Sequence, residues 1–250
     1  MLTEHDLVRA LERLGRSAPV RFDEVTGSTQ ATALRLAAEG SPEWTLVAAG
    51  HQTEGRGRLE RAWRDVPGRG LLFSLVLRPS LPPEGGGLLS LLAGTALAHA
   101  CREVADQRAA CKWPNDVLVA GRKVAGVLAE SVVSGDRFDH VVLGVGVNLA
   151  APPPEHPLAG AVEAEAPALL DAFLAGFARG YQPEHPVFAG AVVGAYREVC
   201  ATLGARVRAF TSEGDLVEGE AVDVDEQGGL VVRTPNGART VRFGAIEHLG

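Results

Sequence analysis

The stretch KWPNDVLVAGRKVAG, residues 112–126, contains both lysines of the chain, Lys112 and Lys123. Its Pro114-Asn115 step and a second, glycine-containing turn break it into short strands, so the hairpin brings Lys123 back toward Lys112. The other 22 of the 24 basic residues are arginine. A retained lysine then indicates a need for a compact ammonium group, although an ordinary turn is the plain alternative. This hairpin is the first candidate for a functional site.

Apolar periodicity on both sides of the hairpin predicts an α+β protein. The apolar pattern predicts helices at residues 3–14, 28–39, 87–105, 164–180 and 187–202. Strands are expected at 44–49, 71–78 and in several pieces between 109 and 149. From residue 205 the period falls to two, which predicts a small β-barrel of about 45 residues. We therefore expect a mixed β-sheet flanked by helices over residues 1–203 and a small barrel over 204–250.

Composition restricts the class of protein. The chain has 250 residues, 46% of them hydrophobic and 22% charged, which excludes a disordered, coiled-coil or collagen-like chain. No apolar run approaches the ~18 residues of a membrane span, and the charged N-terminus does not resemble a signal peptide. A net charge of −7 argues against nucleic acid as the main partner. Three scattered cysteines favour a reducing compartment and no metal site, so we expect a soluble cytoplasmic protein.

A charged, glycine-rich segment at residues 50–70 should lie at the surface as a long loop. It contains Gln52 and the run Gly55-Arg56-Gly57-Arg58. Alternating glycine and arginine offers exposed amides and two forked cations, which suit a phosphate group. A solvated basic loop is the alternative. Neither a P-loop nor a dinucleotide-binding fingerprint is present in the sequence.

Two further motifs combine small and polar residues. Ser28-Thr29-Gln30 begins a predicted helix, where the residues serve either as an N-cap or as hydrogen-bonding groups for a polar ligand. Two glycines on one face of the predicted strand 137–148, within the run ending at Asn148, leave a flat slot. Asn148 could then contact a purine edge, whereas a bulge followed by a turn is the alternative. No arrangement of Ser, His and Asp suggests a hydrolase.

In order and spacing, these motifs together resemble those of biotin protein ligase, over about residues 20–250. The resemblance implies a class II synthetase-like ligase domain followed by an SH3-like barrel. It implies ATP-dependent activation of biotin to biotinyl-5′-AMP, with Mg²⁺, and transfer of biotin to one lysine of a carboxyl carrier domain, such as that of acetyl-CoA carboxylase. The motifs behind it are Ser28-Thr29-Gln30, Gln52 with Gly55-Arg56-Gly57-Arg58, Trp63, Lys112-Trp113-Pro114-Asn115-Asp116, Lys123-Val124-Ala125-Gly126 and Gly144-Val145-Gly146-Val147-Asn148.

The same resemblance implies roles for individual residues. The expected biotin contacts are Ser28, Thr29, Gln30, Gln52, Arg56, Gly57, Arg58, Lys123 and Gly126. The expected ATP contacts are Arg58, Trp63, Lys112, Asn115, Lys123 and Asn148. The expected catalytic groups are Lys123, Arg56, Arg58 and Asp116, of which Asp116 would orient or deprotonate the carrier lysine. The sequence departs from the family at Gln30, where Asn is common, and at Leu59-Glu60, where many members keep glycine and more positive charge.

Other functions remain open at this point. A lipoate or octanoate ligase would share the fold, and a biotin sensor without turnover would share the pocket. Only 27 residues precede Ser28, too few for the winged-helix domain of the bifunctional members, so we expect no DNA binding and no membrane association. The resemblance also allows a homodimer, for which strand 137–148 is the candidate edge.

Overall fold

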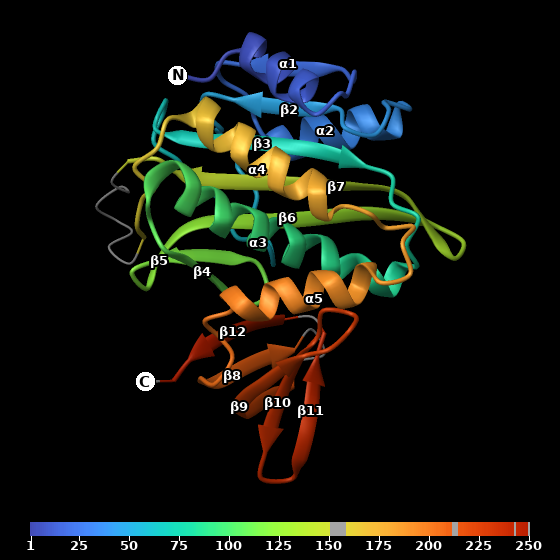
Figure 1. The fold of residues 1–250 in the computed structure, drawn as a ribbon, viewed down its shortest axis with the longest axis vertical. Helices are drawn as coiled ribbons and strands as arrows, with labels where there is room; N and C mark the ends of the chain where they lie inside the picture. Colours follow the sequence, from blue (N-terminus) through green and yellow to red (C-terminus); the bar gives the residue numbers. More distant parts are fainter. Residues whose placement is uncertain (151–158, 212–214, 243, 250) are drawn as a thin grey trace.

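A computed structural model describes residues 1–150, 159–211, 215–242 and 244–249, and it confirms the α+β class (Figure 1). The larger part is built on a seven-stranded sheet in the order β1-β2-β3-β7-β6-β5-β4. Only β1 and β2 are parallel, so the sheet is mixed. Its strands are β1 (Val20–Asp23), β2 (Leu46–Ala49), β3 (Gly70–Leu77), β4 (Ala109–Lys112), β5 (Asp116–Val119), β6 (Arg122–Ser134) and β7 (Arg137–Asn148).

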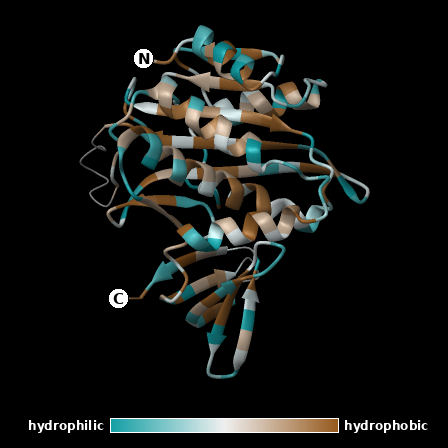
Figure 2. Cartoon of the chain, in the orientation of Figure 1, coloured by the Kyte–Doolittle hydropathy of each residue, from teal (hydrophilic) through white to brown (hydrophobic). Residues whose placement is uncertain are grey.

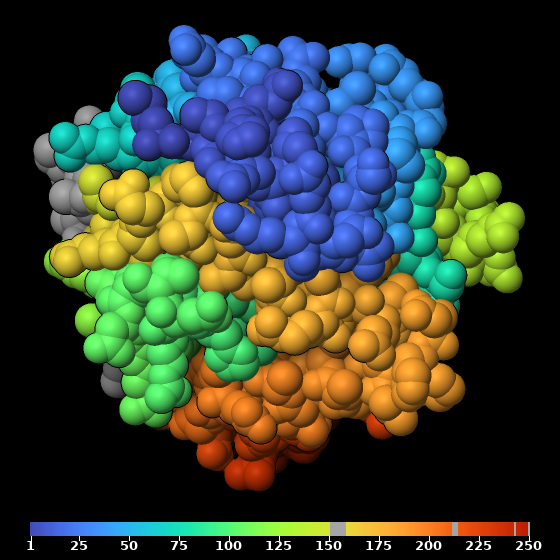
Figure 3. All heavy atoms as spheres, turned by 45° about the horizontal axis from the view of Figure 1, so that its top comes forward, coloured from blue at the N-terminus to red at the C-terminus, as the bar shows by residue number. Residues whose placement is uncertain are grey.

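Helices cover both faces of this sheet, because alternate strand residues point to opposite sides. Leu46 and Ala48 join the main core with α3 (Gly86–Ala105), α4 (Ala166–Gly180) and α5 (Phe188–Val199), whereas Val47 packs in a smaller cluster with α2 (Thr29–Ala38). Figure 2 shows apolar residues concentrated on the central strands and the inner helix faces. The helix α1 (Glu4–Arg13) begins with a Thr3–Asp6 capping box and lies over α4 in the space-filling view (Figure 3).

The long helix α3 is apolar on nearly all sides. The segment Pro83–Ala105 is long and apolar enough to cross a membrane by length and composition alone. Its best window is 67% buried inside the protein, where α3 packs against α4, α5 and the sheet. Burial of most of the helix explains the composition, since a helix that is largely apolar belongs in a protein core or a bilayer.

The C-terminal part is a five-stranded antiparallel sheet in the order β11-β10-β9-β8-β12. It is attached to the larger part through Trp113, whose indole Nε1 donates to the carbonyl of Gly228 at 2.9 Å, and through Arg197, which donates to the carbonyl of Val224 at 2.8 Å. Figure 1 shows α5 between the two sheets. The strands are β8 (Arg206–Thr211), β9 (Leu216–Val224), β10 (Leu230–Thr234), β11 (Gly237–Val241) and β12 (Gly244–His248).

The structure corrects three sequence expectations. Strand 137–148 is not an edge: β7 is central, paired with β3 on one side and β6 on the other. The outer strands are β4 and the short β1, which the sequence did not reveal because only four residues form it. The loop at residues 50–70 does lie largely at the surface, but its Asp65 side chain is only 2% exposed.

Candidate active site

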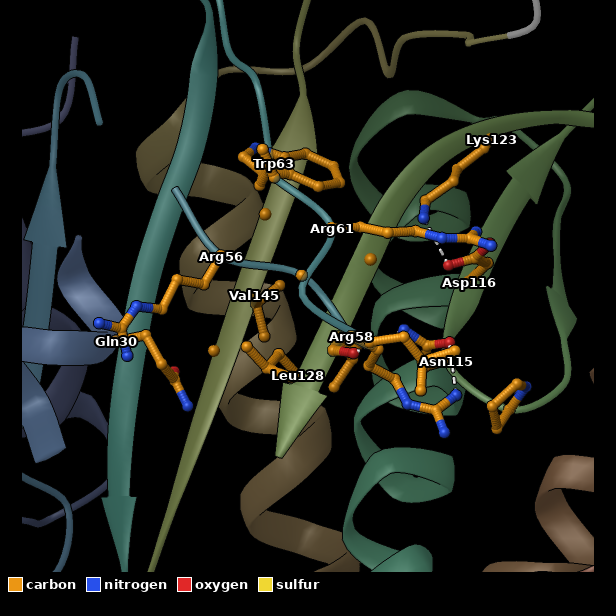
Figure 4. Close-up of a pocket in the computed structure, with 18 of the residues that line it drawn as sticks. Gln30, Arg56, Arg58, Arg61, Trp63, Asn115, Asp116, Lys123, Leu128 and Val145 are labelled. Carbon is orange, nitrogen blue, oxygen red and sulfur yellow. Dashed lines mark hydrogen bonds and ion pairs between the residues drawn. The ribbon is translucent and has the colours of Figure 1, made fainter. Parts of the chain in front are cut away.

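A cavity of about 240 Å³ lies between the sheet, the Gly-Arg loop and the barrel. Figure 4 shows the loop and the strands of the sheet around it. Every predicted site residue lines the cavity except Asn148, and those that do come from four segments of the chain, at 28–30, 52–63, 112–116 and 123–126. The amide of Asn148 donates instead to the carbonyl of Gly160 at 3.1 Å. The predicted residues that line the cavity are Ser28, Thr29, Gln30, Gln52, Arg56, Gly57, Arg58, Trp63, Lys112, Asn115, Asp116, Lys123 and Gly126.

One end of the cavity is built by the first turn of α2. Ser28 is the N-cap, and its hydroxyl accepts from the amide of Ala31. The Gln52 side-chain carbonyl accepts from the backbone amide of Thr29 at 2.8 Å, so it satisfies a helix donor that has no partner within the helix. The Gln52 amide nitrogen makes no hydrogen bond within the described part of the chain. This end therefore presents small polar groups that are already held in position.

Gln30 is fixed on the sheet below this end. Its amide nitrogen donates to the carbonyl of Val142 at 3.0 Å, and its oxygen accepts from the Ser74 hydroxyl at 3.1 Å. The side chain is 3% exposed, and a Cβ on Gly144 would overlap its amide oxygen. The longer Gln in place of Asn is thus accommodated by glycine on β7.

A pair of glycines supports Trp63 in the middle of the cavity. Gly126 on β6 and Gly146 on β7 are direct cross-strand partners. A Cβ on Gly146 would lie 2.6 Å from Trp63 Cε2, and one on Gly126 would lie 3.2 Å from Cζ3. The indole therefore packs on the flat slot that these glycines leave, and its buried Nε1 has no hydrogen-bond partner among the described residues.

The other end of the cavity is charged. Lys123 Nζ lies 2.6 Å from Asp116 Oδ1 and 5.8 Å from the centre of the Trp63 ring. Arg58 donates to Asn115 Oδ1 at 3.3 Å, and Asn115 donates in turn to the carbonyl of Val127 at 2.8 Å. Burial lowers the pKa of Arg58, and the nearby Asp116 carboxylate partly offsets this. Among the described lining residues, Asp116 is the only carboxylate, so the site favours anionic ligands.

The two loop arginines serve different ends of the cavity. In Figure 4, Arg56 points toward Gln30, whereas Arg58 points toward Asn115. Their separation follows from a small hairpin in the loop, in which Arg56 bridges Ala62 and Gly57 donates to the carbonyl of Arg61 at 2.7 Å. Arg61, which also lines the cavity, lies beside Asp116.

Sequence reasoning missed several lining residues. Ser74 on β3 connects Thr29 to Gln30 through hydroxyl and amide hydrogen bonds, and only the sheet register places it there. The barrel strand β12 contributes part of the wall, although its sequence carries no polar motif. The lining residues without a sequence signal include Phe73, Ser74, Leu128, Gly244, Ala245 and Ile246.

Comparisons with known proteins agree with this arrangement. Residues 23–148 match the biotin/lipoate A/B protein ligase family, and residues 202–249 match the biotin protein ligase C-terminal domain. The biotin–[acetyl-CoA-carboxylase] ligase of Paracoccus denitrificans is 36% identical, over 86% of this chain and 95% of its own length. The bifunctional ligase/repressor BirA of Bacillus subtilis is 31% identical, over 90% of this chain and 73% of its own length.

A solved structure has the same fold. The biotin protein ligase of Aquifex aeolicus, in complex with biotin and ATP, superposes with a TM-score of 0.76. It is 25% identical, and the match covers 92% of this chain and 99% of the other. The chain therefore belongs to the biotin/lipoate A/B protein ligase family, among its biotin protein ligases.

Proposed function

We propose that this single cavity carries out both half-reactions of biotin ligation. In the first, biotin and ATP give biotinyl-5′-AMP and pyrophosphate. In the second, biotin passes to a lysine of a carboxyl carrier domain. The observation that carries the proposal is that one cavity joins a polar end at Ser28, Thr29 and Gln52 to a cationic end at Arg58 and Lys123.

The polar end suits the ureido ring of biotin. The Gln52 amide nitrogen supplies a donor, and the buried hydroxyls of Ser28 and Thr29 supply groups that both donate and accept. These groups are fixed before the ligand arrives, by the helix start and by Ser74. Preorganised groups of this kind lose little freedom on binding.

The cationic end suits the meeting of two anions. The biotin carboxylate attacks the α-phosphorus of ATP, and negative charge grows on the phosphoryl oxygens as pyrophosphate leaves. Lys123, Arg56 and Arg58 stabilise this charge, Lys112 assists, and Trp63 and Asn115 hold the nucleotide. We keep Asn148 as a nucleotide contact, although its side chain bonds to the carbonyl of Gly160 and does not line the cavity. The charged loop at residues 50–70, which we call the arginine loop, lies across the reacting groups. It keeps water from biotinyl-5′-AMP, which is a mixed anhydride.

Mg²⁺ fits this site only as an ion carried largely by ATP. Asp116 is the one carboxylate in the described lining, and its Oδ1 already contacts Lys123. Mg²⁺ is commonly bound by one or two carboxylates together with substrate phosphates. The ATP phosphates would therefore hold the ion, and it would neutralise phosphate charge when bound.

In the second half-reaction Asp116 orients or deprotonates the carrier lysine, which must attack as a neutral amine. The partner is the carrier domain of a biotin-dependent carboxylase, and the enzyme works in the cytoplasm. Its net charge of −7 favours such a protein partner over DNA. A homodimer formed by extending the sheet would use an outer strand such as β1, since both sides of β7 are paired.

We place the boundary between the ligase domain, residues 1–203, and the SH3-like domain, residues 204–250, in the segment between α5 and β8. The segment is short, and α5 ends at Val199 whereas β8 begins at Arg206. The two parts share the cavity through β12, so the boundary is topological and both parts are needed for activity.

The test is pyrophosphate release from ATP and Mg²⁺ by the purified protein with biotin, with lipoate or with neither. We expect release with biotin only, followed by biotinylation of an added carrier domain. Release with lipoate but not with biotin would show that the protein is a lipoate ligase. Binding of biotin without release would indicate a sensor and contradict the proposal.

A further inference from the structure

Asp65 is a buried carboxylate that biotin ligation does not use. It lies in the second half of the charged loop, yet its side chain is only 2% exposed and does not line the cavity. Two groups from the first half of the loop bind it. The backbone amide of Gln52 lies 3.3 Å from Asp65 Oδ1, and His51 Nδ1 lies 2.8 Å from Asp65 Oδ2.

The chemistry of this pair defines its hydrogen bonding. An ionised carboxylate only accepts hydrogen bonds. His51 Nδ1 therefore carries the hydrogen and donates a hydrogen bond to Asp65 Oδ2. A buried carboxylate is costly unless hydrogen bonds replace its lost hydration. Removing the His51 donor would leave Asp65 Oδ2 without this hydrogen bond, and the segment could recover its solvation only by opening.

The pair closes the base of the arginine loop. The first half of the loop is held against the segment before α2. The backbone amide of Thr26 donates to the carbonyl of His51 at 3.0 Å, and that of Thr53 donates to the carbonyl of Thr26 at 2.9 Å. The second half of the loop is tied to its beginning by a backbone hydrogen bond, from the amide of Gly68 to the carbonyl of Gly50 at 3.1 Å. Asp65 adds a side-chain link between the two halves of the loop.

This link connects two groups that face the cavity. Gln52, held through its backbone amide, is the residue whose side chain caps α2 and lines the polar end. Trp63 lies two residues before Asp65 and packs on Gly126 and Gly146. A shift of Asp65 would therefore move both the polar end and the aromatic middle of the cavity.

We propose that His51 and Asp65 are positioning residues that hold the arginine loop closed over the bound ligand. The pair determines how tightly biotin and its adenylate are held, and leaves the chemical steps to the residues that line the cavity. That the loop covers biotin and its adenylate rests on the proposed function. That the His51–Asp65 pair holds the loop closed does not rest on it.

The first test compares two substitutions at one position. In His51→Ala the donor to Asp65 is lost, whereas in His51→Asn an amide nitrogen can replace Nδ1. We expect His51→Ala to raise the KM for biotin about tenfold, with kcat for ligation within about twofold, because an unpaired buried acceptor weakens closure by that order. His51→Asn should recover most of the affinity. His99→Ala, on an exposed position of α3, is the matched control.

The second test needs no substrate. Trypsin can cut after Arg56, Arg58, Arg61 and Arg64, all within the loop. Without ligand, His51→Ala should be cut there about tenfold faster than the wild type, whereas cutting after Arg137, exposed at the start of β7, should not change. Fragment masses identify each bond.

The results separate this inference from the proposed function. Equal cutting rates in the wild type and His51→Ala would overturn the positioning role, and so would equal losses in His51→Ala and His51→Asn. A wild type without biotin-dependent pyrophosphate release would overturn the proposed function. In that case the trypsin comparison would still decide whether the pair closes the loop.

Discussion

Substitution of Gly146 by alanine should separate the two substrates of the enzyme. A Cβ at this position would lie 2.6 Å from Trp63 Cε2 and 2.9 Å from Cζ2. Carbon atoms normally pack at about 3.5–4.0 Å, so the indole must move by roughly 1 Å. Gly146 is on a central strand, paired with both Leu72 and Gly126, so the backbone cannot yield in its place.

The magnitude follows from the cost of overpacking, which is typically ~1–3 kcal/mol. If Trp63 contacts the nucleotide as we propose, the KM for ATP should rise by roughly 5- to 150-fold. The KM for biotin should stay within about twofold, because the Gln30 and Gln52 hydrogen bonds lie at the other end. Pyrophosphate release at varied ATP and varied biotin measures both constants.

Fluorescence gives an independent measure of the same displacement. Trp44 and Trp113 are 2% and 1% exposed, whereas Trp63 is half-buried, so changes in emission will report mainly on Trp63. In Gly146→Ala the emission should shift to longer wavelength as the indole moves toward solvent.

Two further variants make the result decisive. Gly194→Ala in α5 is the matched control, since its Cβ would meet nothing within 4 Å. Gly144→Ala should do the reverse of Gly146→Ala, raising the KM for biotin, because its Cβ would overlap Gln30. The reasoning is refuted if Gly144→Ala and Gly146→Ala raise the same constant, or if Gly146→Ala leaves the KM for ATP unchanged.

Three other outcomes follow from the same geometry. Lys123→Arg should lower the rate of adenylate formation by roughly 10²–10³, since a planar guanidinium cannot take the place of the ammonium beside Asp116; near-normal single turnovers would contradict this role. Asp116→Ala should slow transfer to the carrier more than adenylate formation in rapid-quench assays, whereas equal slowing would assign it to holding Lys123. Burial raises the pKa of Cys101 to about 12 and that of Cys111 well above its usual range. At pH 8 both therefore stay as thiols, and mass spectrometry after treatment with iodoacetamide should find Cys200 alkylated first. Rapid alkylation of Cys111 would contradict this and show that β4 separates from the sheet.

Local patterns predicted most of the helices and strands, but not the arrangement of the sheet. The α2 and α3 segments were visible as apolar periods with a cap or a turn at each end. The central position of β7 was not deduced, although its continuous apolar run from 141 to 147 is typical of a strand that is covered on both faces. The four residues of β1 carry no comparable pattern, because a strand this short is formed by pairing with β2.

The site shows the same division. Motif residues such as Gln52, Arg58 and Lys123 could be named because their motifs, in order and spacing, resemble those of biotin protein ligase. Ser74 could not, because an isolated serine in an apolar strand becomes informative only when the register places it beside Thr29. Asp65 was hidden for a different reason, since a carboxylate in a charged loop is expected to be solvated.

The wall that β12 adds to the cavity has a consequence for how the enzyme is made. Gly244, Ala245 and Ile246 line the same space as Lys123 and Arg58, although they follow every strand of the seven-stranded sheet in the sequence. All seven strands of that sheet therefore emerge from the ribosome before the wall does. A molecule whose β12 has not yet emerged and docked thus lacks part of the wall that encloses the acyl-adenylate.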